Sequence, residues 1–288
     1  MQIANLFHEK KTVLSLEVFP PKKSSSIETI YSTLNDLQDL QPDFISVTYG
    51  AGGNAGDTAT CDIATVIRTK YNTPPLAHLT CVNYSKEEID KILNLLEQNG
   101  IENILALRGD ISPEITPKKE FRYASELVAF IKERGGFHVS GACYPEGHID
   151  SINPEEDIHH LKSKVEAGAE HLISQLFFDN SFFYSFLEKA RGAGIKAPIQ
   201  AGIMPVVNKA QIERMVTLCG ASLPAKFTKM MQRFEHSPEA LRDAGIAYAV
   251  DQIVDLIAQG VDGIHLYTMN NSLIAKRIYS NVAGLMRG

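Results

Sequence analysis

The stretch "LSLEVFPPKK", residues 14–23, has the pattern of a β-strand that ends at two prolines. Successive side chains of a strand point to opposite faces. One face is apolar, with Leu14, Leu16 and Val18, and the other holds Ser15, Glu17 and Phe19. Pro20 and Pro21 end the strand because neither can donate a ladder hydrogen bond. Two interpretations of Glu17 stay open: a solvated side chain on an N-terminal edge strand, or a buried carboxylate, which is costly unless paired or neutralised.

Seven further apolar, β-branched runs follow this strand at regular intervals. They are FISVTYG from Phe44, PLAHLTC from Pro75, NILALRGD from Asn103, FHVSGACYPE from Phe137, HLISQLFFD from His171, PIQAGIMPV from Pro198 and GIHLYTMN from Gly263. Counted from Val13, the first seven starts lie 27 to 34 residues apart. That spacing is typical of a strand followed by a helix and a right-handed crossover.

Helical patterns fill the gaps between these runs. The capping-box patterns Ser25-x-x-Glu28 and Ser85-x-x-Glu88 each precede apolar residues at helical spacing, and the second helix should stop at Gly100. The long gap at 207–261 should hold at least two helices. Eight such units predict an α/β fold, a single (β/α)₈ TIM barrel over residues 1–288. An open doubly wound sheet is the alternative, but it usually carries a glycine-rich fingerprint where this chain has two prolines.

The composition is that of an ordinary globular protein, with 44% hydrophobic and 22% charged residues. A net charge of −6 argues against a nucleic-acid surface. No apolar stretch approaches membrane-spanning length, and the N-terminus lacks a signal-peptide core, so we expect no membrane contact. The four cysteines show no CxxC spacing, which fits a reducing, cytoplasmic location and argues against a thiolate zinc site.

Polar side chains collect at the carboxyl ends of the predicted strands. They are Glu17, Thr48, Tyr49, His78, Arg108, Asp110, Tyr144, Glu146, His148, Gln175, Tyr267 and Asn270. In a (β/α)₈ barrel these ends meet at one mouth, where catalysis takes place. Each residue alone is more often structural than catalytic, but a purely structural barrel needs no such ring.

The ring favours neither metal nor Schiff-base chemistry. There is no HxH or HExxH pattern, and no strand end carries a lysine. The segments Gly50–Gly53 and Arg108–Asp110 would let the backbone approach a large planar or phosphorylated ligand. A tight turn is the simpler explanation of the glycines.

The ordered set LSLEVFPPK, SVTYGAGG, LAHLTC, LALRGD, CYPEGH, SQLFFDN, GIMPV and HLYTMN resembles the methylenetetrahydrofolate reductases of the short bacterial type. The match follows strand order over essentially the whole chain. The resemblance implies a flavoprotein that binds FAD non-covalently and reduces 5,10-methylenetetrahydrofolate to 5-methyltetrahydrofolate, with NAD(P)H as the electron donor. It also implies a role in one-carbon metabolism and methionine biosynthesis, and a homo-oligomer.

The resemblance assigns roles to individual residues. FAD would contact Tyr49, Ala51, His78, Arg108, Gly109, Asp110, Ala124, Tyr144, His148, Asp157, His160 and Lys164. Folate or nicotinamide would contact Thr48, Gln175, Gln211 on the loop after the seventh strand, Met215 and Tyr267. Arg108 and Lys164 suit the pyrophosphate as charge-assisted donors.

Two carboxylates are implied to be catalytic. Glu17 would be the general acid that protonates N10 as the imidazolidine ring of the substrate opens, leaving an iminium at N5 that accepts hydride in a ping-pong reaction. Desolvation should raise the pKa of Glu17 so that it holds a proton near neutral pH. Asp110 would hydrogen-bond the pterin ring and stabilise the iminium.

Several positions depart from the family pattern. Met215 stands where better-known members have a phenylalanine, and Asn271 where they have an arginine; His160 and Ser163 replace an amide and an arginine near the presumed FAD phosphates. These changes put the electron donor and the binding of the folate glutamate tail in doubt. One alternative is therefore a flavin barrel that takes electrons from a protein partner. Another is a flavin-free, pterin-binding barrel methyltransferase.

Overall fold

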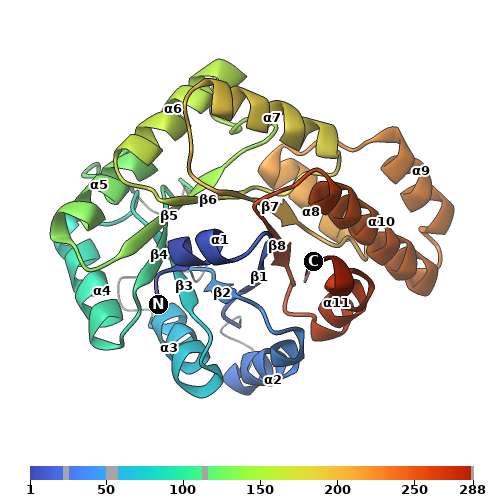
Figure 1. Ribbon diagram of the computed structural model, residues 1–288, viewed down its shortest axis with the longest axis horizontal. Coiled ribbons are helices and arrows are strands. Elements are labelled where there is room, and N and C mark those ends of the chain that lie inside the picture. The colour runs from blue at the N-terminus through green and yellow to red at the C-terminus, as the bar shows by residue number, and fades with distance from the viewer. Residues whose placement is uncertain (22–25, 50–57, 112–115, 287–288) are drawn as a thin grey trace.

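The computed structural model describes residues 1–21, 26–49, 58–111 and 116–286. Eight parallel strands pair in chain order, and the last pairs with the first, so the sheet closes into a barrel (Figure 1). The strands are β1 (Val13–Val18), β2 (Phe44–Val47), β3 (Pro75–Thr80), β4 (Asn103–Leu107), β5 (His138–Cys143), β6 (His171–Ser174), β7 (Ile199–Ile203) and β8 (Gly263–Tyr267). The predicted (β/α)₈ barrel is confirmed and the open sheet is wrong. Because β1 lies between β2 and β8, the edge-strand interpretation of Glu17 is wrong as well.

Helices surround the barrel and connect its strands (Figure 1). They are α1 (Leu6–Glu9), α2 (Ile27–Leu37), α3 (Ala59–Tyr71), α4 (Lys86–Gln98), α5 (Ala124–Arg134), α6 (Pro154–Glu166), α7 (Asn180–Gly192), α8 (Lys209–Cys219), α9 (Ala225–Phe234), α10 (Pro238–Ala258) and α11 (Ser272–Met286), with short 3₁₀ turns η1 (Ile3–Asn5) and η2 (Gln38–Leu40). The long gap before β8 holds α8, α9 and α10, in line with the expectation of at least two helices. No helix in the described ranges is long and apolar enough to cross a membrane.

The helix ends follow local sequence signals, with one shift. At α4 the capping box is complete: the Ser85 hydroxyl accepts from the Glu88 amide at 3.2 Å, and the Glu88 carboxylate accepts from the Ser85 amide at 2.8 Å. At α2 the cap is Ser26, not the predicted Ser25, which lies outside the described residues. The α4 stop is confirmed, since Gly100 adopts φ +70° just beyond the helix, a conformation that glycine reaches without a Cβ penalty.

The barrel has an apolar outer layer and a closed N-terminal end. Leu14, Leu16 and Val18 pack outward against the surrounding helices in the main hydrophobic core. Ile3 and Leu6, from the segment before β1, pack against the first residues of several strands and cover the N-terminal end of the barrel. The opposite end, formed by the carboxyl ends of the strands, is therefore where a ligand can enter.

Candidate active site

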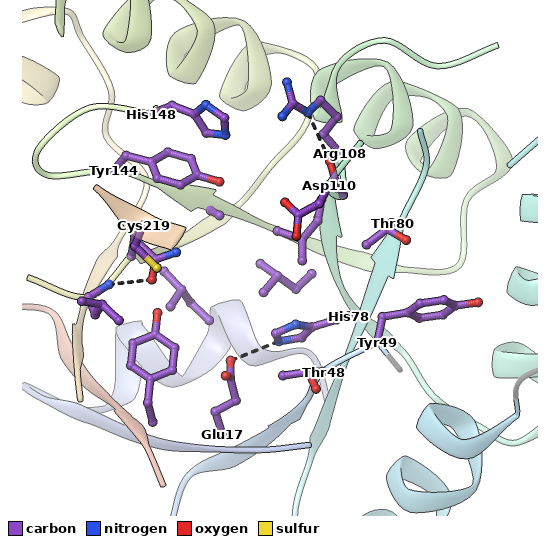
Figure 2. A pocket seen from close by; sticks show the side chains of 18 of the residues that line it. Glu17, Thr48, Tyr49, His78, Thr80, Arg108, Asp110, Tyr144, His148 and Cys219 are labelled. Carbon is purple, nitrogen blue, oxygen red and sulfur yellow. Dashed lines mark hydrogen bonds and ion pairs between the residues drawn. The ribbon is translucent and has the colours of Figure 1, made fainter. Parts of the chain in front are cut away.

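A cavity of about 680 Å³ opens at the carboxyl ends of the strands (Figure 2). Among the predicted site residues it is lined by Glu17, Thr48, Tyr49, His78, Arg108, Gly109, Asp110, Tyr144, His148, Gln175, Met215 and Tyr267. These side chains come from seven different strands or the turns that follow them, and from α8. The size falls within the range of sites for cofactors and drug-sized ligands. The barrel geometry thus gathers most of the predicted residues into one space.

Other predicted residues lie outside the lining of this cavity. Asp157 borders a second hollow of about 360 Å³, which shares Tyr144 with the first. The Lys164 ammonium donates to the carbonyl of Ala142 at 2.5 Å, and burial lowers the pKa of this lysine. His160 is exposed beside the ring of Tyr123. Also outside the lining are Ala124, the first residue of α5, and Gln211, which lies in the first turn of α8 rather than on the loop that we predicted. Ala51 and the rest of Gly50–Gly53 lie outside the described residues.

The Glu17 carboxylate lies among three polar partners inside the barrel mouth. Its Oε2 is 3.3 Å from His265 Nε2 and 3.5 Å from His78 Nε2, and it accepts a hydrogen bond from the Ser46 hydroxyl at 3.5 Å. The side chain is only 16% exposed. Figure 2 shows Glu17 and His78 directed toward one another.

These partners reverse the predicted pKa of Glu17. Burial raises it, as we expected, but the hydrogen bond with His265 and the attraction that the two imidazoles exert in their protonated forms outweigh burial, so the pKa is lowered. The prediction of a raised pKa is therefore wrong, because the sequence analysis placed His78 at the same mouth but did not place His265 beside the carboxylate. Burial also lowers the pKa of His78 to about 4, so this ring is neutral at pH 7.

His78, which lines the cavity, has one ring nitrogen without a hydrogen-bond partner. Its Nε2 is buried and has no hydrogen-bond partner, since the approach to Glu17 at 3.5 Å lacks hydrogen-bond geometry. Buried polar atoms without partners are uncommon and call for an explanation such as a ligand. Asn83, which also lines the cavity, has an unsatisfied Oδ1.

Arg108 supplies a cation at the rim of the cavity. Its Nη2 donates to the Asp150 carboxylate at 2.7 Å, and its Nε donates to the carbonyl of Gly109 at 3.3 Å. Gly109 has φ +86°, and a Cβ there would lie 2.9 Å from the Thr80 Cβ, so only glycine fits. A guanidinium that already holds an anionic oxygen, next to accessible backbone, suits a phosphate group.

Sequence reasoning missed His265, the partner of Glu17. Its signal was the alternation along β8, which turns Gly263, His265 and Tyr267 to the same face. The β1–β8 register pairs Ser15 with His265 and Glu17 with Tyr267. Tyr267 lines the cavity as predicted, but its hydroxyl donates to the carbonyl of Ser174 at 2.8 Å. Within the described ranges, no group of three or more His, Cys, Asp or Glu side chains could hold a metal ion.

Comparisons with known proteins point to one family. A family model described as methylenetetrahydrofolate reductase matches residues 2–283. The 5,10-methylenetetrahydrofolate reductase of Pectobacterium carotovorum is 35% identical, over 92% of this chain and 88% of its own. Methylenetetrahydrofolate reductase (NADH) 1 of Arabidopsis thaliana is 34% identical over 98% of this chain, which spans only half the length of that relative. A solved structure of an uncharacterized Clostridium thermocellum protein that binds two copies of 5-methyl-5,6,7,8-tetrahydrofolic acid shares the fold, with a TM-score of 0.66, 12% identity and 98% coverage of both chains.

Proposed function

The chain belongs to the methylenetetrahydrofolate reductase family, and from this premise we propose that it reduces 5,10-methylenetetrahydrofolate to 5-methyltetrahydrofolate with bound FAD and electrons from NAD(P)H. The observation that carries the proposal is the pairing of Glu17 with two imidazoles inside a cavity that also holds Asp110. A buried carboxylate beside proton-bearing groups is suited to proton transfer.

The residues around the cavity fit a flavin dinucleotide. Arg108 offers a guanidinium for the pyrophosphate, and Gly109 beside it also lines the cavity. The unsatisfied Nε2 of His78 and Oδ1 of Asn83 would gain partners from polar atoms of a ring system. Tyr144 packs edge-on against His148 along one wall, with ring centroids 4.6 Å apart. When bound, the flavin would carry the hydride equivalent from the nicotinamide to the folate.

The protein's own contribution is proton transfer, orientation and charge. Glu17 would deliver a proton to N10 of the folate, so that the imidazolidine ring opens. The exposed Asp110 carboxylate, at the mouth, would hydrogen-bond the pterin and stabilise the cationic iminium of the substrate. Met215 and Gln175 line the same cavity and would pack against or hydrogen-bond the folate or the nicotinamide.

The proposal is tested by the variant Glu17→Gln in two anaerobic half-reactions followed by flavin absorbance. The variant should retain FAD and be reduced by NADH at a rate within about twofold of wild type. Its reoxidation by methylenetetrahydrofolate should fall by about 100-fold or more, the usual contribution of a general acid. Glu166→Gln, the same change at an exposed position of α6, is the matched control and should leave both rates unchanged. Folate reduction near the wild-type rate in Glu17→Gln would refute the assignment.

The same experiment separates the two alternatives. A flavin that ignores NADH, yet is reoxidised by folate after chemical reduction, would show that a protein partner supplies the electrons. No flavin binding, even after reconstitution with FAD, would favour a flavin-free pterin enzyme. Asp110→Asn should slow the folate half-reaction more than it weakens FAD retention. A loss of FAD as its main defect would make Asp110 a structural anchor.

A further inference from the structure

A row of buried polar side chains continues from Glu17 toward the N-terminal end of the barrel. Its members are His265, Ser15, Gln200, His171, Ser140 and His138, each 0% exposed. Barrel interiors of this fold are usually filled by branched apolar side chains. A fully buried polar row is costly unless every member has a hydrogen-bond partner, so the arrangement calls for a reason.

Short contacts join the upper members of the row to the proposed acid. His265 Nε2 lies 3.3 Å from Glu17 Oε2, and its Nδ1 lies 2.7 Å from the Ser15 hydroxyl. The same hydroxyl is 3.3 Å from Gln200 Oε1. Gln200 Oε1 also lies 3.0 Å from His171 Nε2. Ser15 thus stands between two neighbours but has only one proton to donate.

The orientation of Gln200 is fixed by the backbone. Its amide nitrogen donates to the carbonyls of Val13 at 3.1 Å and Ile264 at 3.3 Å. Its Oε1 therefore faces the row and can only accept hydrogen bonds. For the contact between Ser15 and Gln200 to be a hydrogen bond, Ser15 must be the donor. His265 must then donate from Nδ1 to Ser15.

This order of donors determines what His265 can do for Glu17. With its stable proton on Nδ1, the ring presents Nε2 to the carboxylate as the position where a second proton is gained or lost. That proton lies either on Nε2, giving an imidazolium beside a carboxylate, or on Glu17 Oε2, giving a neutral pair. If Ser15 donated to Nδ1 instead, the neutral ring would keep its only proton on Nε2 and have none to pass on.

We propose that Gln200 is a positioning residue for proton delivery by Glu17, because its Oε1 takes the Ser15 hydroxyl and thereby selects the Nδ1-protonated tautomer of His265. The inference rests on the proposed function. Its step balances as follows: the proton leaves His265 Nε2, passes through Glu17 Oε2 and ends on N10 of the folate. The neutral, Nδ1-protonated ring and the carboxylate that remain are protonated again from water in the open cavity. The amide ends the path, so no proton travels beyond Gln200 toward His171.

Other charged and titratable groups face this pair. His78 on β3 approaches Glu17. Tyr267, on β8 like His265, has its ring centroid 5.0 Å from that of His265. His171 on β6 lies below Gln200. Burial lowers the pKa of His171 well below its usual range, so it remains neutral and donates from Nε2 to Gln200. None of the three can take the place of Gln200 as acceptor for Ser15, because none is in hydrogen-bond contact with that hydroxyl in the described structure.

The test uses the FAD-loaded full chain with Gln200→Met, which keeps the side-chain length but removes the acceptor, and Ser15→Ala, which removes the hydroxyl. In both, the pH at which the folate half-reaction reaches half its maximal rate should fall by about one unit, and the rate above that pH should fall about tenfold, the effect expected for one lost buried hydrogen bond. Reduction by NADH should stay within twofold. Ser140→Ala removes a buried serine hydroxyl below Gln200 and is the matched control; its profile should be that of wild type.

A second readout does not depend on turnover. Nitrogen-15 NMR of the His265 ring, assigned with a His265→Asn variant, should show Nδ1 protonated in wild type and Nε2 protonated in Gln200→Met. An Nε2-protonated neutral ring in wild type, or a pH profile unchanged in both Gln200→Met and Ser15→Ala, would overturn the inference. If Gln200→Met does not fold, the pH profile of Ser15→Ala, which keeps Gln200, decides whether the inference holds. Failure of the proposed function would instead appear as normal folate reduction by Glu17→Gln.

Discussion

The lower end of the buried row terminates in an ion pair that should stabilise the barrel. Glu170, just before β6, places Oε2 3.2 Å from His138 Nδ1, and its other oxygen pairs with Lys132. His138 Nε2 lies 3.3 Å from the Ser140 hydroxyl, so both ring nitrogens have hydrogen-bond partners. The hydrogen bond from His138, together with Lys132, lowers the pKa of Glu170 to about 2, against an ordinary 4.5.

The magnitude follows from that difference in pKa. Taken in full, a change from 4.5 to about 2 is worth about 3 kcal/mol of folding free energy. Glu170 is 36% exposed, so solvent screening reduces the expected value to about 1–2 kcal/mol. Because the pKa is depressed in the folded state, this stabilisation is fully present above about pH 5. It is lost as the pH falls from there toward 2.

The assay is urea unfolding of wild type, Glu170→Gln and Lys132→Met at pH 7 and pH 4. At pH 7 we expect Glu170→Gln to lower the free energy of unfolding by about 1–2 kcal/mol, since glutamine keeps a hydrogen bond to His138 but removes the charge. The difference in unfolding free energy between wild type and Glu170→Gln should be smaller at pH 4 than at pH 7. Lys132→Met, which removes only the half-exposed partner, should cost less than about 0.5 kcal/mol. The reasoning would be refuted if wild type and Glu170→Gln differed by less than about 0.3 kcal/mol in unfolding free energy at pH 7, or if their difference grew at pH 4.

Two further predictions concern the cavity rim and the packing behind it. Asp150→Asn should tighten FAD binding about two- to fivefold in a fluorescence titration of apoprotein, because Arg108 loses its 2.7 Å carboxylate partner; weaker binding would contradict the proposed pyrophosphate role of Arg108. Gly245→Ala should lower the unfolding free energy by about 2–3 kcal/mol or more in thermal melts, since a Cβ would lie 1.7 Å from the Val206 carbonyl oxygen. The control Gly284→Ala, in α11 with nothing within 4 Å, should be neutral or stabilising, and equal effects of the two would count against the packing argument.

The fold was predictable from the sequence because strand signals are local. The alternating and β-branched runs placed all eight strands, with starts within one residue at Phe137 and Pro198, where β5 and β7 begin one position later. The α2 cap was missed by one position, since adjacent serines offer the same hydroxyl and the sequence pattern does not distinguish between them. Local chemistry thus fixes the order of elements but not every boundary.

The candidate site was predictable only where barrel geometry alone decides. Residues at strand ends, such as Arg108 and Tyr144, converge in any barrel of this type. The contact of Glu17 with His265 depends on the register at which β8 closes against β1, and it joins residues about 250 positions apart in the sequence. Alternation along β8 turns His265 to the interior face, but it does not show that His265 meets Glu17, and the pKa of Glu17 was therefore predicted in the wrong direction.

Buried polar atoms without hydrogen-bond partners are distributed unevenly between the barrel interior below Glu17 and the mouth of the barrel. Below Glu17 every polar side chain of the buried row has a partner in the described structure. The buried side-chain atoms left without partners among the described residues are Gln38 Nε2, His78 Nε2, Asn83 Oδ1 and Glu146 Oε1. Two of these line the main cavity and a third lines the adjoining hollow. Because a barrel that evolved for stability alone would satisfy or remove such atoms, their position beside the two hollows supports the proposal that bound molecules complete the hydrogen bonding there.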